Sequence, residues 1–331
     1  MKRIGHLFEK AFTQENLFQA YRDASRHKQG KRACFQFSRR LGRNLELLHV
    51  ALQNGSYRPR PYYNFMVCEP KPRQIYAPAF ADLVVQHAIY RVVYPIFNRT
   101  FIDQSYACRK DKGTHAAADY AQAALAASPR DSYVLKMDIR KFFYRIDRDI
   151  LRTFIERQIK DRRFVEVMML FADHGEPAGI PIGNLLSQLY ALIYLNQLDH
   201  FAKRELKAKR YCRYVDDFVI VGVGKREAEE ILARIVAFLQ GLRLELSKYS
   251  ITKVKYGINF VGYRTWASKR FIRKRSLFVF HRAVQLSKIE SAISILGHAR
   301  RTHSLRYLIT TLKEKRHDLQ LPKAYRRYQD R

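Results

Sequence analysis

A short segment, YCRYVDDFVIVG at residues 211–222, constrains the fold more than any other part of the chain. Apolar and aromatic residues that favour β-strands stand on both sides of two adjacent carboxylates, Asp216 and Asp217. This pattern predicts a tight hairpin with the two acids at its tip. Burying two carboxylates in an apolar strand is costly unless a cation pairs with them, and hard oxygen ligands suit magnesium. A surface turn that happens to hold two aspartates is the competing interpretation.

A third acid stands at the end of another predicted strand. Residues 133–138 read YVLKMD, an apolar strand that ends at Asp138. An aspartate at a strand end is usually a cap or turn residue. If the two strands are neighbours, however, Asp138 and Asp216 converge as a two-metal site requires. In such sites two cations ~4 Å apart clamp the attacking and leaving oxygens of a phosphoryl transfer.

The charge of the chain indicates a polyanionic partner. Its 331 residues include 62 Lys and Arg against 30 Asp and Glu, a formal net charge of +32. An excess of this size favours nucleic acid. A membrane surface fits less well, because we find no basic amphipathic helix with a broad apolar face and no apolar stretch that could span a bilayer. Four cysteines outside any C-x-x-C pair, together with a start that lacks a signal peptide, predict a cytoplasmic protein.

Two segments carry cations in places that suit phosphate. Residues 63–77 predict a β-hairpin with Lys71 and Arg73 at or near its tip, where cations can close over a triphosphate. An ordinary charged turn is an equal alternative there. Residues 105–117 place Arg109 and Lys112 just before a predicted helix, and the N-terminus of a helix favours phosphate.

Apolar spacing predicts the remaining elements. Helices are expected over residues 1–60, 82–98 and 227–238, and strands over 242–246 and 257–263, the second with a glycine at an expected bend. The segment after residue 263 contains 18 Lys and Arg against 4 Asp and Glu, with a weak helical periodicity. This composition predicts a basic helical domain that follows a duplex backbone.

In order along the chain, these segments resemble the motifs of the reverse transcriptases. The matches are KPR at 71–73, KMDIRKFF at 136–143, IPIGNLLSQ at 180–188, YVDD at 214–217 and FVGY at 260–263. The resemblance implies an α+β right-hand polymerase fold with fingers, a palm containing an antiparallel sheet, and a helical thumb. It also implies a helical N-terminal segment over 1–60, fingers over 61–130, a palm over 131–263 with a finger insertion at about 160–185, and a basic helical thumb over 264–331.

The resemblance implies roles for individual residues. The three palm acids, Asp138, Asp216 and Asp217, would be catalytic. Together with the backbone of Ile139 they would hold two Mg²⁺ ions, and Mn²⁺ is an alternative metal. The incoming deoxynucleotide would meet Lys71, Arg73, Phe143, Ile182, Gly183 and Gln188, with the ring of Phe143 rejecting a 2′-hydroxyl. Primer and template would meet Tyr214, Arg109, Lys112, Phe260, Gly262 and Tyr263. Lys248 and Lys253 both remain candidates for a general acid.

One departure from the family pattern points to a subfamily. Most reverse transcriptases have Gln and Pro where this chain has Ile182 and Gln188. The I-G-x-x-x-S-Q pattern is similar to that of diversity-generating retroelements, including the one from a Bordetella phage. Such enzymes copy a template-repeat RNA into cDNA with frequent errors opposite adenine, and they work with a small basic accessory protein. An apolar Ile182 near the templating base would penalise mispairs less.

Three other interpretations stay open at this point. A retron-type or group II intron-like reverse transcriptase of normal fidelity would carry the Gln and Pro. A non-catalytic basic RNA-binding scaffold has little reason to bury three acids together. An RNA polymerase with a similar palm is disfavoured by the bulk of Phe143 at the sugar.

Overall fold

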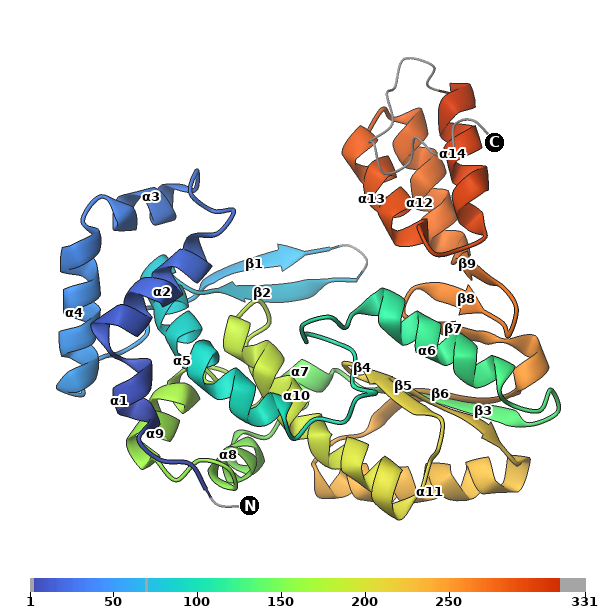
Figure 1. Ribbon diagram of the computed structural model, residues 1–331, viewed down its shortest axis with the longest axis horizontal. Coiled ribbons are helices and arrows are strands. Elements are labelled where there is room, and N and C mark those ends of the chain that lie inside the picture. The colour runs from blue at the N-terminus through green and yellow to red at the C-terminus, as the bar shows by residue number, and fades with distance from the viewer. Residues whose placement is uncertain (1–2, 69–70, 316–331) are drawn as a thin grey trace. The chain divides into compact units, whose positions relative to one another are not determined.

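The computed structural model describes residues 3–68 and 71–315 (Figure 1). The chain divides into two compact units. The first unit comprises Met1–Asp103, Ile139–Glu205 and Ile235–Ser247. The second comprises Gln104–Asp138, Leu206–Arg234 and Lys248–Arg331. The expected fingers, palm and thumb boundaries stay predictions, and the last part of the expected thumb lies outside the described residues.

The first unit is mainly helical. Its centre is α10 (Leu185–His200), most of whose residues are buried and which therefore carries apolar residues on several sides. Helix α2 (Gln14–Ser25) packs on α5 (Phe80–Asn98) beside it. One hairpin, β1 (Tyr63–Val67) and β2 (Arg73–Ala77), is antiparallel, as the sequence predicted. The other helices are α1 (Leu7–Ala11), α3 (Arg32–Ser38), α4 (Leu41–Gln53), α7 (Phe142–Arg145), α8 (Arg148–Glu156), α9 (Arg162–Leu170) and a π-helix (Phe201–Glu205).

The second unit is built on a four-stranded sheet in the order β4-β5-β3-β6. The strands are β3 (Tyr133–Ile139), β4 (Tyr211–Tyr214), β5 (Asp217–Val223) and β6 (Leu246–Lys253). Helix α6 (Thr114–Ala126) covers one face, where its alanines pack on apolar residues of β3, β4 and β5 (Figure 1). Helix α11 (Lys225–Gly241) follows β5 in the chain.

A small three-stranded sheet and three helices complete the second unit. The strands are β7 (Ile258–Phe260), β8 (Tyr263–Thr265) and β9 (Arg270–Ile272), all antiparallel. Helices α12 (Lys274–Gln285), α13 (Ile289–Ala299) and α14 (Ser304–Lys315) share an apolar core with Tyr263 and Ile272. None of the helices among the described residues has the length and apolar character needed to cross a bilayer.

Two strand predictions were wrong. Residues 242–245 close α11 instead of forming a strand, because Leu242 and Leu244 both donate backbone hydrogen bonds to Leu239 and Arg243 takes φ 53°; the strand begins at Leu246. Residues 257–263 do not form the single bent strand that was expected either, but a hairpin. Val261 and Gly262 have φ 41° and 89°, which reverses the chain and separates β7 from β8.

Candidate active site

The two adjacent acids lie where the sequence placed them, at the tip of the β4–β5 hairpin. Tyr214 pairs with Asp217, so the connecting turn consists of Val215 and Asp216 alone. Val215 has φ 55°, an unfavourable conformation for a β-branched residue. Asp216 is therefore the second residue of this turn, and Asp217 is the first residue of β5.

A buried arginine, Arg213, forms a hydrogen bond to the backbone of this turn. Arg213 is 1% exposed, and its Nη1 donates to the carbonyl oxygen of Val215 at 2.9 Å while its Nη2 donates to Ser105 Oγ at 3.1 Å. Its backbone pairs with the segment before α6: Arg213 N donates to Gln104 O and Tyr106 N donates to Arg213 O, both at 3.0 Å. Arg213 was not among the residues predicted from the sequence, although an arginine inside an otherwise apolar strand was a usable signal.

The third acid faces the hairpin across the sheet. Strands β3 and β5 pair antiparallel with Asp138 directly opposite Asp217. Directly opposed residues have Cβ atoms within about 4.5–5.5 Å on the same face of the sheet. The two strands are therefore neighbours, as the predicted site requires, but the acid opposite Asp138 is Asp217 rather than the expected Asp216, which lies in the adjoining turn.

Lys136 forms an ion pair with one of these acids. Its Nζ bonds to Asp217 Oδ1, and the two side chains are only 17% and 20% exposed. Burial raises the pKa of Asp217; the charge of Lys136 opposes this rise, and the nearby Asp138 adds to it. Because Lys136 stands two residues before Asp138 in β3, the two side chains share a face, a spacing from which its position could have been inferred.

The acids fit a divalent cation by their chemistry. Carboxylate oxygens are the donors that Mg²⁺ prefers, and the Lys136 ammonium already stands as a cation against Asp217. Within residues 3–68 and 71–315, no cluster of three or more His, Cys, Asp and Glu side chains has the geometry of a metal centre. The assignment of two ions to Asp138, Asp216, Asp217 and the backbone of Ile139 stays a prediction. Ile139 itself is buried at the end of β3.

The first unit gathers most of the residues predicted to meet the nucleotide. Tyr76 N of β2 donates to Ile182 O at 2.7 Å, and Ile180 N donates to Phe143 O of α7 at 2.9 Å. These bonds join the hairpin, the IPIG segment and α7, which are far apart in sequence. Phe143 and Ile182 are half-buried, and the remaining members of the set are exposed: Lys71, Arg73, Gly183 and Gln188.

The structure requires glycine at position 183 for a reason other than the expected approach of a base. Its φ is 105°, and a Cβ at this position would lie 2.7 Å from Ile75 Cγ2 of the hairpin. The next residue, Asn184, caps α10 by accepting from Leu186 N at 3.1 Å, and its Nδ2 donates to Tyr62 Oη at 2.8 Å. Asn184 and Tyr62, which fix the start of α10, were not among the residues predicted from the sequence.

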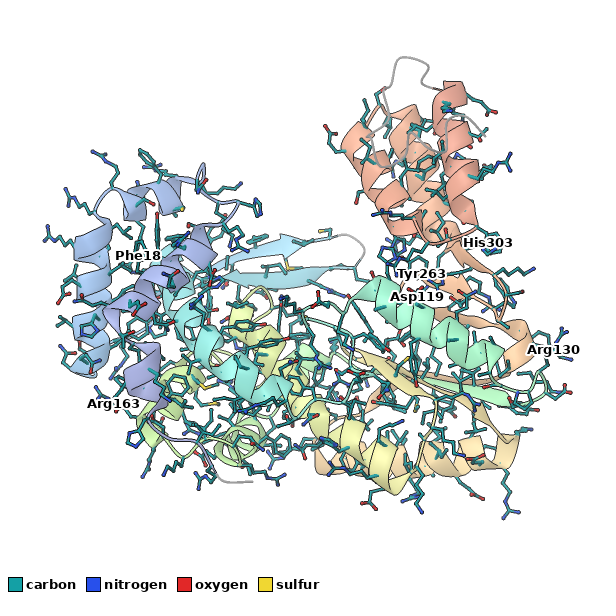
Figure 2. All side chains as sticks on the ribbon, viewed as in Figure 1. Phe18, Asp119, Arg130, Arg163, Tyr263 and His303 are labelled. Carbon is teal, nitrogen blue, oxygen red and sulfur yellow. The ribbon has the colours of Figure 1, made fainter. Side chains whose placement is uncertain are left out.

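The residues predicted to meet primer and template are mostly occupied by contacts within the second unit. Phe260 and Tyr263 are 1% and 0% exposed. Tyr263, labelled in Figure 2, lies where α6 and the α12–α14 helices meet β8. Its Oη donates to His298 O at 2.8 Å and contacts the Nδ1 atoms of His298 and His115 at 3.0 and 3.2 Å. Tyr214 is half-buried, and Gly262 is the second residue of the β7–β8 turn.

Cations of the basic loop before α6 contact the segment that leads into the loop. Arg109 Nη1 donates to Ser105 O at 3.0 Å, and Lys112 Nζ lies 5.3 Å from the ring centre of Tyr106. Of the two lysines considered as a general acid, Lys248 lines a cavity together with Asp138, whereas Lys253 is not among the residues that line it.

Comparisons of sequence identify a family and several relatives. The family model described as "Reverse transcriptase (RNA-dependent DNA polymerase)" matches residues 69–265. Protein YkfC of Escherichia coli (strain K12) is 27% identical over 301 residues, which cover 76% of this chain and 77% of YkfC. Group II intron-encoded protein LtrA of Lactococcus lactis subsp. cremoris is 28% identical over 171 residues, which cover 48% of this chain and 28% of LtrA.

Comparisons of structure bear on the fold. Apo telomerase from Candida tropicalis matches with a TM-score of 0.54 and 12% identity, covering 78% of this chain and 58% of that one. Telomerase from Candida albicans, in complex with a fragment of telomeric RNA, matches with a TM-score of 0.50 and 14% identity, covering 78% and 55%. These likenesses confirm the predicted α+β right-hand polymerase fold.

Proposed function

Because this chain belongs to the reverse transcriptase (RNA-dependent DNA polymerase) family, we propose that it makes error-prone cDNA in a diversity-generating retroelement, of the kind found in a Bordetella phage. It would copy a template-repeat RNA from a primer, using deoxynucleoside triphosphates, with errors concentrated opposite adenine. The cDNA would then replace a variable repeat in a target gene. A small basic accessory protein would assist, and the setting would be the cytoplasm of a bacterial, archaeal or phage-infected cell.

The opposition of Asp138 and Asp217 across β3 and β5, with Asp216 in the adjoining turn, carries the proposal of polymerase chemistry. Two bound Mg²⁺ ions would supply the charge that stabilises the attacking and leaving oxygens of phosphoryl transfer. The acids would hold these ions through their carboxylates. Lys71 and Arg73, both exposed at the hairpin tip, would bind the triphosphate, and Phe143 would exclude a ribose 2′-hydroxyl.

The environment of Ile182 supports the error-prone subfamily. Its carbonyl oxygen is already engaged by Tyr76 N at 2.7 Å, and its side chain has no polar atom. A glutamine here would bring an amide to the same half-buried position, whereas isoleucine contributes only apolar surface. A site that gives up a hydrogen bond to its substrate discriminates less between correct and incorrect partners.

Primer extension tests both levels of the proposal. The purified chain would be given an RNA template, a primer, Mg²⁺ and the four deoxynucleotides, with and without its retroelement partners, and the cDNA would be sequenced. We expect extension with errors concentrated opposite adenine. Ile182→Gln should lower that error rate, and an unchanged rate would remove the proposed role of Ile182.

A normal-fidelity reverse transcriptase is the second candidate, favoured by the similarity to the group II intron protein LtrA. Accurate extension in the same assay would move the assignment to that group. Asp216→Ala separates both from a non-catalytic scaffold, because a polymerase would lose extension completely and a scaffold would keep its function. RNA binding measured on the same variant shows whether the protein is still folded.

A further inference from the structure

A cavity of about 500 Å³ lies within the first unit, where three helices end. Residues 99–102 follow α5, residues 157–158 follow α8, and the remaining wall comes from the end of α10 and from the π-helix after it. A volume of this order is typical of small-ligand sites. The lining includes none of the residues predicted to meet metal, nucleotide, primer or template.

The cavity and the residues predicted to meet the nucleotide lie at opposite ends of α10. Gly183 and Asn184 stand just before the helix begins, whereas Asn196 and His200 lie in its last two turns and line the cavity. At about 1.5 Å per residue, Leu185 and Asn196 are roughly 16 Å apart along the helix axis. A ligand in this cavity is therefore distinct from a nucleotide that is bound beside Gly183.

The lining of the cavity is positively charged. Arg99, Arg157 and Arg204 contribute to it and are exposed, and no Asp or Glu stands among the lining residues that the structure describes. The guanidinium of Arg157 lies 5.0 Å from the ring centre of Phe154, a stacking contact that leaves the N–H edge of the group open to a ligand. Guanidinium groups bind phosphate through that edge. The electrostatics of the cavity therefore favour an anionic ligand.

Protein carboxylates do not neutralise these three arginines. No ion pair of Arg99, Arg157 or Arg204 is found over the described ranges 3–68 and 71–315. The partial negative charge at the ends of α5 and α8 stabilises Arg99 and Arg157, which follow these helices directly. That effect explains two of the cations without a ligand, but it does not explain the next feature of the cavity.

A buried amide oxygen next to the arginines lacks a partner. Asn196 is 7% exposed, and its Oδ1 accepts no hydrogen bond within the described part of the chain. A buried acceptor left in this state is unfavourable. Asn196 lines both the cavity and a recess of about 40 Å³, which shares Arg157 and Gln197 with the cavity. The recess is large enough for a hydroxyl group.

The hydrogen bonds of Thr100 show that the unpaired atom is an acceptor. The Thr100 hydroxyl donates to Phe97 O at 2.7 Å, so its only proton is used. It can therefore only accept from Asn196, whose Nδ2 lies 3.4 Å away. If the amide were turned over, Oδ1 would face an oxygen that has no proton to give. The group that satisfies Asn196 Oδ1 must therefore be a donor, such as a hydroxyl group.

We propose that this cavity binds a small phosphate ester that carries a hydroxyl group, a ribose phosphate by chemical class. The phosphate lies among Arg99, Arg157 and Arg204, and a sugar hydroxyl group donates to Asn196 Oδ1. The ligand is either a free sugar phosphate or one ribose of an RNA strand, since both offer these two groups. Binding requires no metal ion, template or catalytic acid, and it is therefore independent of the proposed polymerase chemistry.

Isothermal titration calorimetry of the full chain in EDTA tests the cations. The probes are ribose 5-phosphate and inorganic phosphate, neither of which is a polymerase substrate. Arg99→Gln with Arg204→Gln should weaken binding of both probes at least tenfold, because both contain the anion. The matched control is Arg32→Gln with Arg43→Gln, which removes two exposed arginines of α3 and α4 that do not line the cavity. The control should change either affinity less than threefold.

Asn196→Leu tests the hydroxyl group separately. This variant removes the acceptor but none of the cations, so it should weaken ribose 5-phosphate at least fivefold and change the affinity for inorganic phosphate less than twofold. Circular dichroism melting shows that each variant is folded, and Asn196→Ala provides the same comparison if the leucine variant does not fold. An unchanged affinity of the folded variant for ribose 5-phosphate would remove the role of Asn196 and with it the proposed ligand class.

Competition identifies the source of the ligand. A short RNA and a DNA of the same sequence would each be added to the titration with ribose 5-phosphate. Competition by the RNA alone identifies a ribose of an RNA strand, and competition by neither strand identifies a free sugar phosphate. Equal competition by RNA and DNA, equal weakening by the two double variants, or no saturable binding of ribose 5-phosphate by the unmodified chain would overturn the proposal.

Discussion

The guanidinium of Arg213 donates a 2.9 Å hydrogen bond to the carbonyl oxygen of Val215, the residue that begins the turn carrying Asp216. A positive φ at a β-branched residue costs ~1–3 kcal/mol and persists only where surrounding contacts hold it. Arg213, anchored also on Ser105, is such a contact. We therefore regard Arg213 as a positioning residue, which acts on the acids through the turn.

Arg213→Met should lower kcat for primer extension by tenfold or more with little change in KM for the deoxynucleotide. The substitution leaves the Val215 carbonyl and the Ser105 hydroxyl without their partner, and unsatisfied buried groups cost ~1–3 kcal/mol each. Arg210→Met is the matched control, because Arg210 also donates to a backbone carbonyl, that of Ala127, but away from the acids. Equal kcat values for the two variants would contradict the assigned role.

Lys136→Met should make the protein respond to lower concentrations of Mg²⁺. Lys136 competes with a metal ion for Asp217, and its removal takes away the ammonium paired with Asp217 while Asp138 still lies opposite. The metal-free protein should melt at a lower temperature, and the gain in melting temperature on adding Mg²⁺ should be larger, since ligand binding to the folded state stabilises it. Lys225→Met, at an exposed position in α11, serves as the control. An unchanged midpoint of the Mg²⁺ titration would show that Lys136 does not compete.

Gly183→Ala should destabilise the protein and raise KM for the deoxynucleotide. Alanine at φ 105° is strained, and its Cβ would lie 2.7 Å from Ile75 of the β1–β2 hairpin; strain of this kind costs ~1–3 kcal/mol. Gly42→Ala should have the opposite effect on the free energy of unfolding. Gly42 lies in α4 with nothing within 4 Å of the added Cβ, so alanine there should stabilise by ~0.5–1 kcal/mol. Urea unfolding curves of the two variants provide the comparison, and destabilisation by both would contradict this account.

The free energy of unfolding should fall as the pH drops below about 6.5, partly through His298. Burial lowers the pKa of His298 from its ordinary value of 6.5, and a hydrogen bond to the carbonyl of Gly262 partly opposes this. The unfolded chain therefore binds a proton that the folded chain does not, so the stability present above pH 6.5 is lost as the pH falls toward the folded pKa. The slope from one histidine reaches at most ~1.4 kcal/mol per pH unit. Urea unfolding between pH 7.5 and 5.5 should give a smaller slope for His298→Gln, and identical slopes would exclude His298 as a source.

The sequence alone was sufficient to predict the secondary-structure elements that depend on a local pattern of residues. The hairpin around Asp216 and Asp217, the strand ending near Asp138 and the helix beginning after Gly183 all follow from apolar periodicity and turn residues. The convergence of Asp138 with Asp216 was expected only if their strands were neighbours, which periodicity alone does not determine, and the register sets Asp217 opposite Asp138 instead. The right-hand fold came from the order of motifs along the chain.

Long-range contacts were the part that could not be predicted. Arg213 and Lys136 read as ordinary strand residues until the partners Val215 and Asp217 are placed around them. A bend at a glycine was expected within 257–263, but the full reversal made by Val261 and Gly262 was not, because valine rarely adopts a positive φ. Tyr263 was expected to meet a primer, yet its hydroxyl group is bonded to His298 by a contact between distant segments.

The division of the chain into interleaved units has a consequence for its biosynthesis. The chain passes from one unit to the other five times, and the first unit includes residues up to Ser247. A ribosome must therefore release about three-quarters of the sequence before the first unit has all its parts. Until then the apolar sides of α10 have no complete shell to bury them, and nascent chains with exposed apolar surface are prone to aggregate. We expect synthesis of this protein to depend on chaperones that bind the emerging chain, and neither unit can be expressed alone as one uninterrupted fragment.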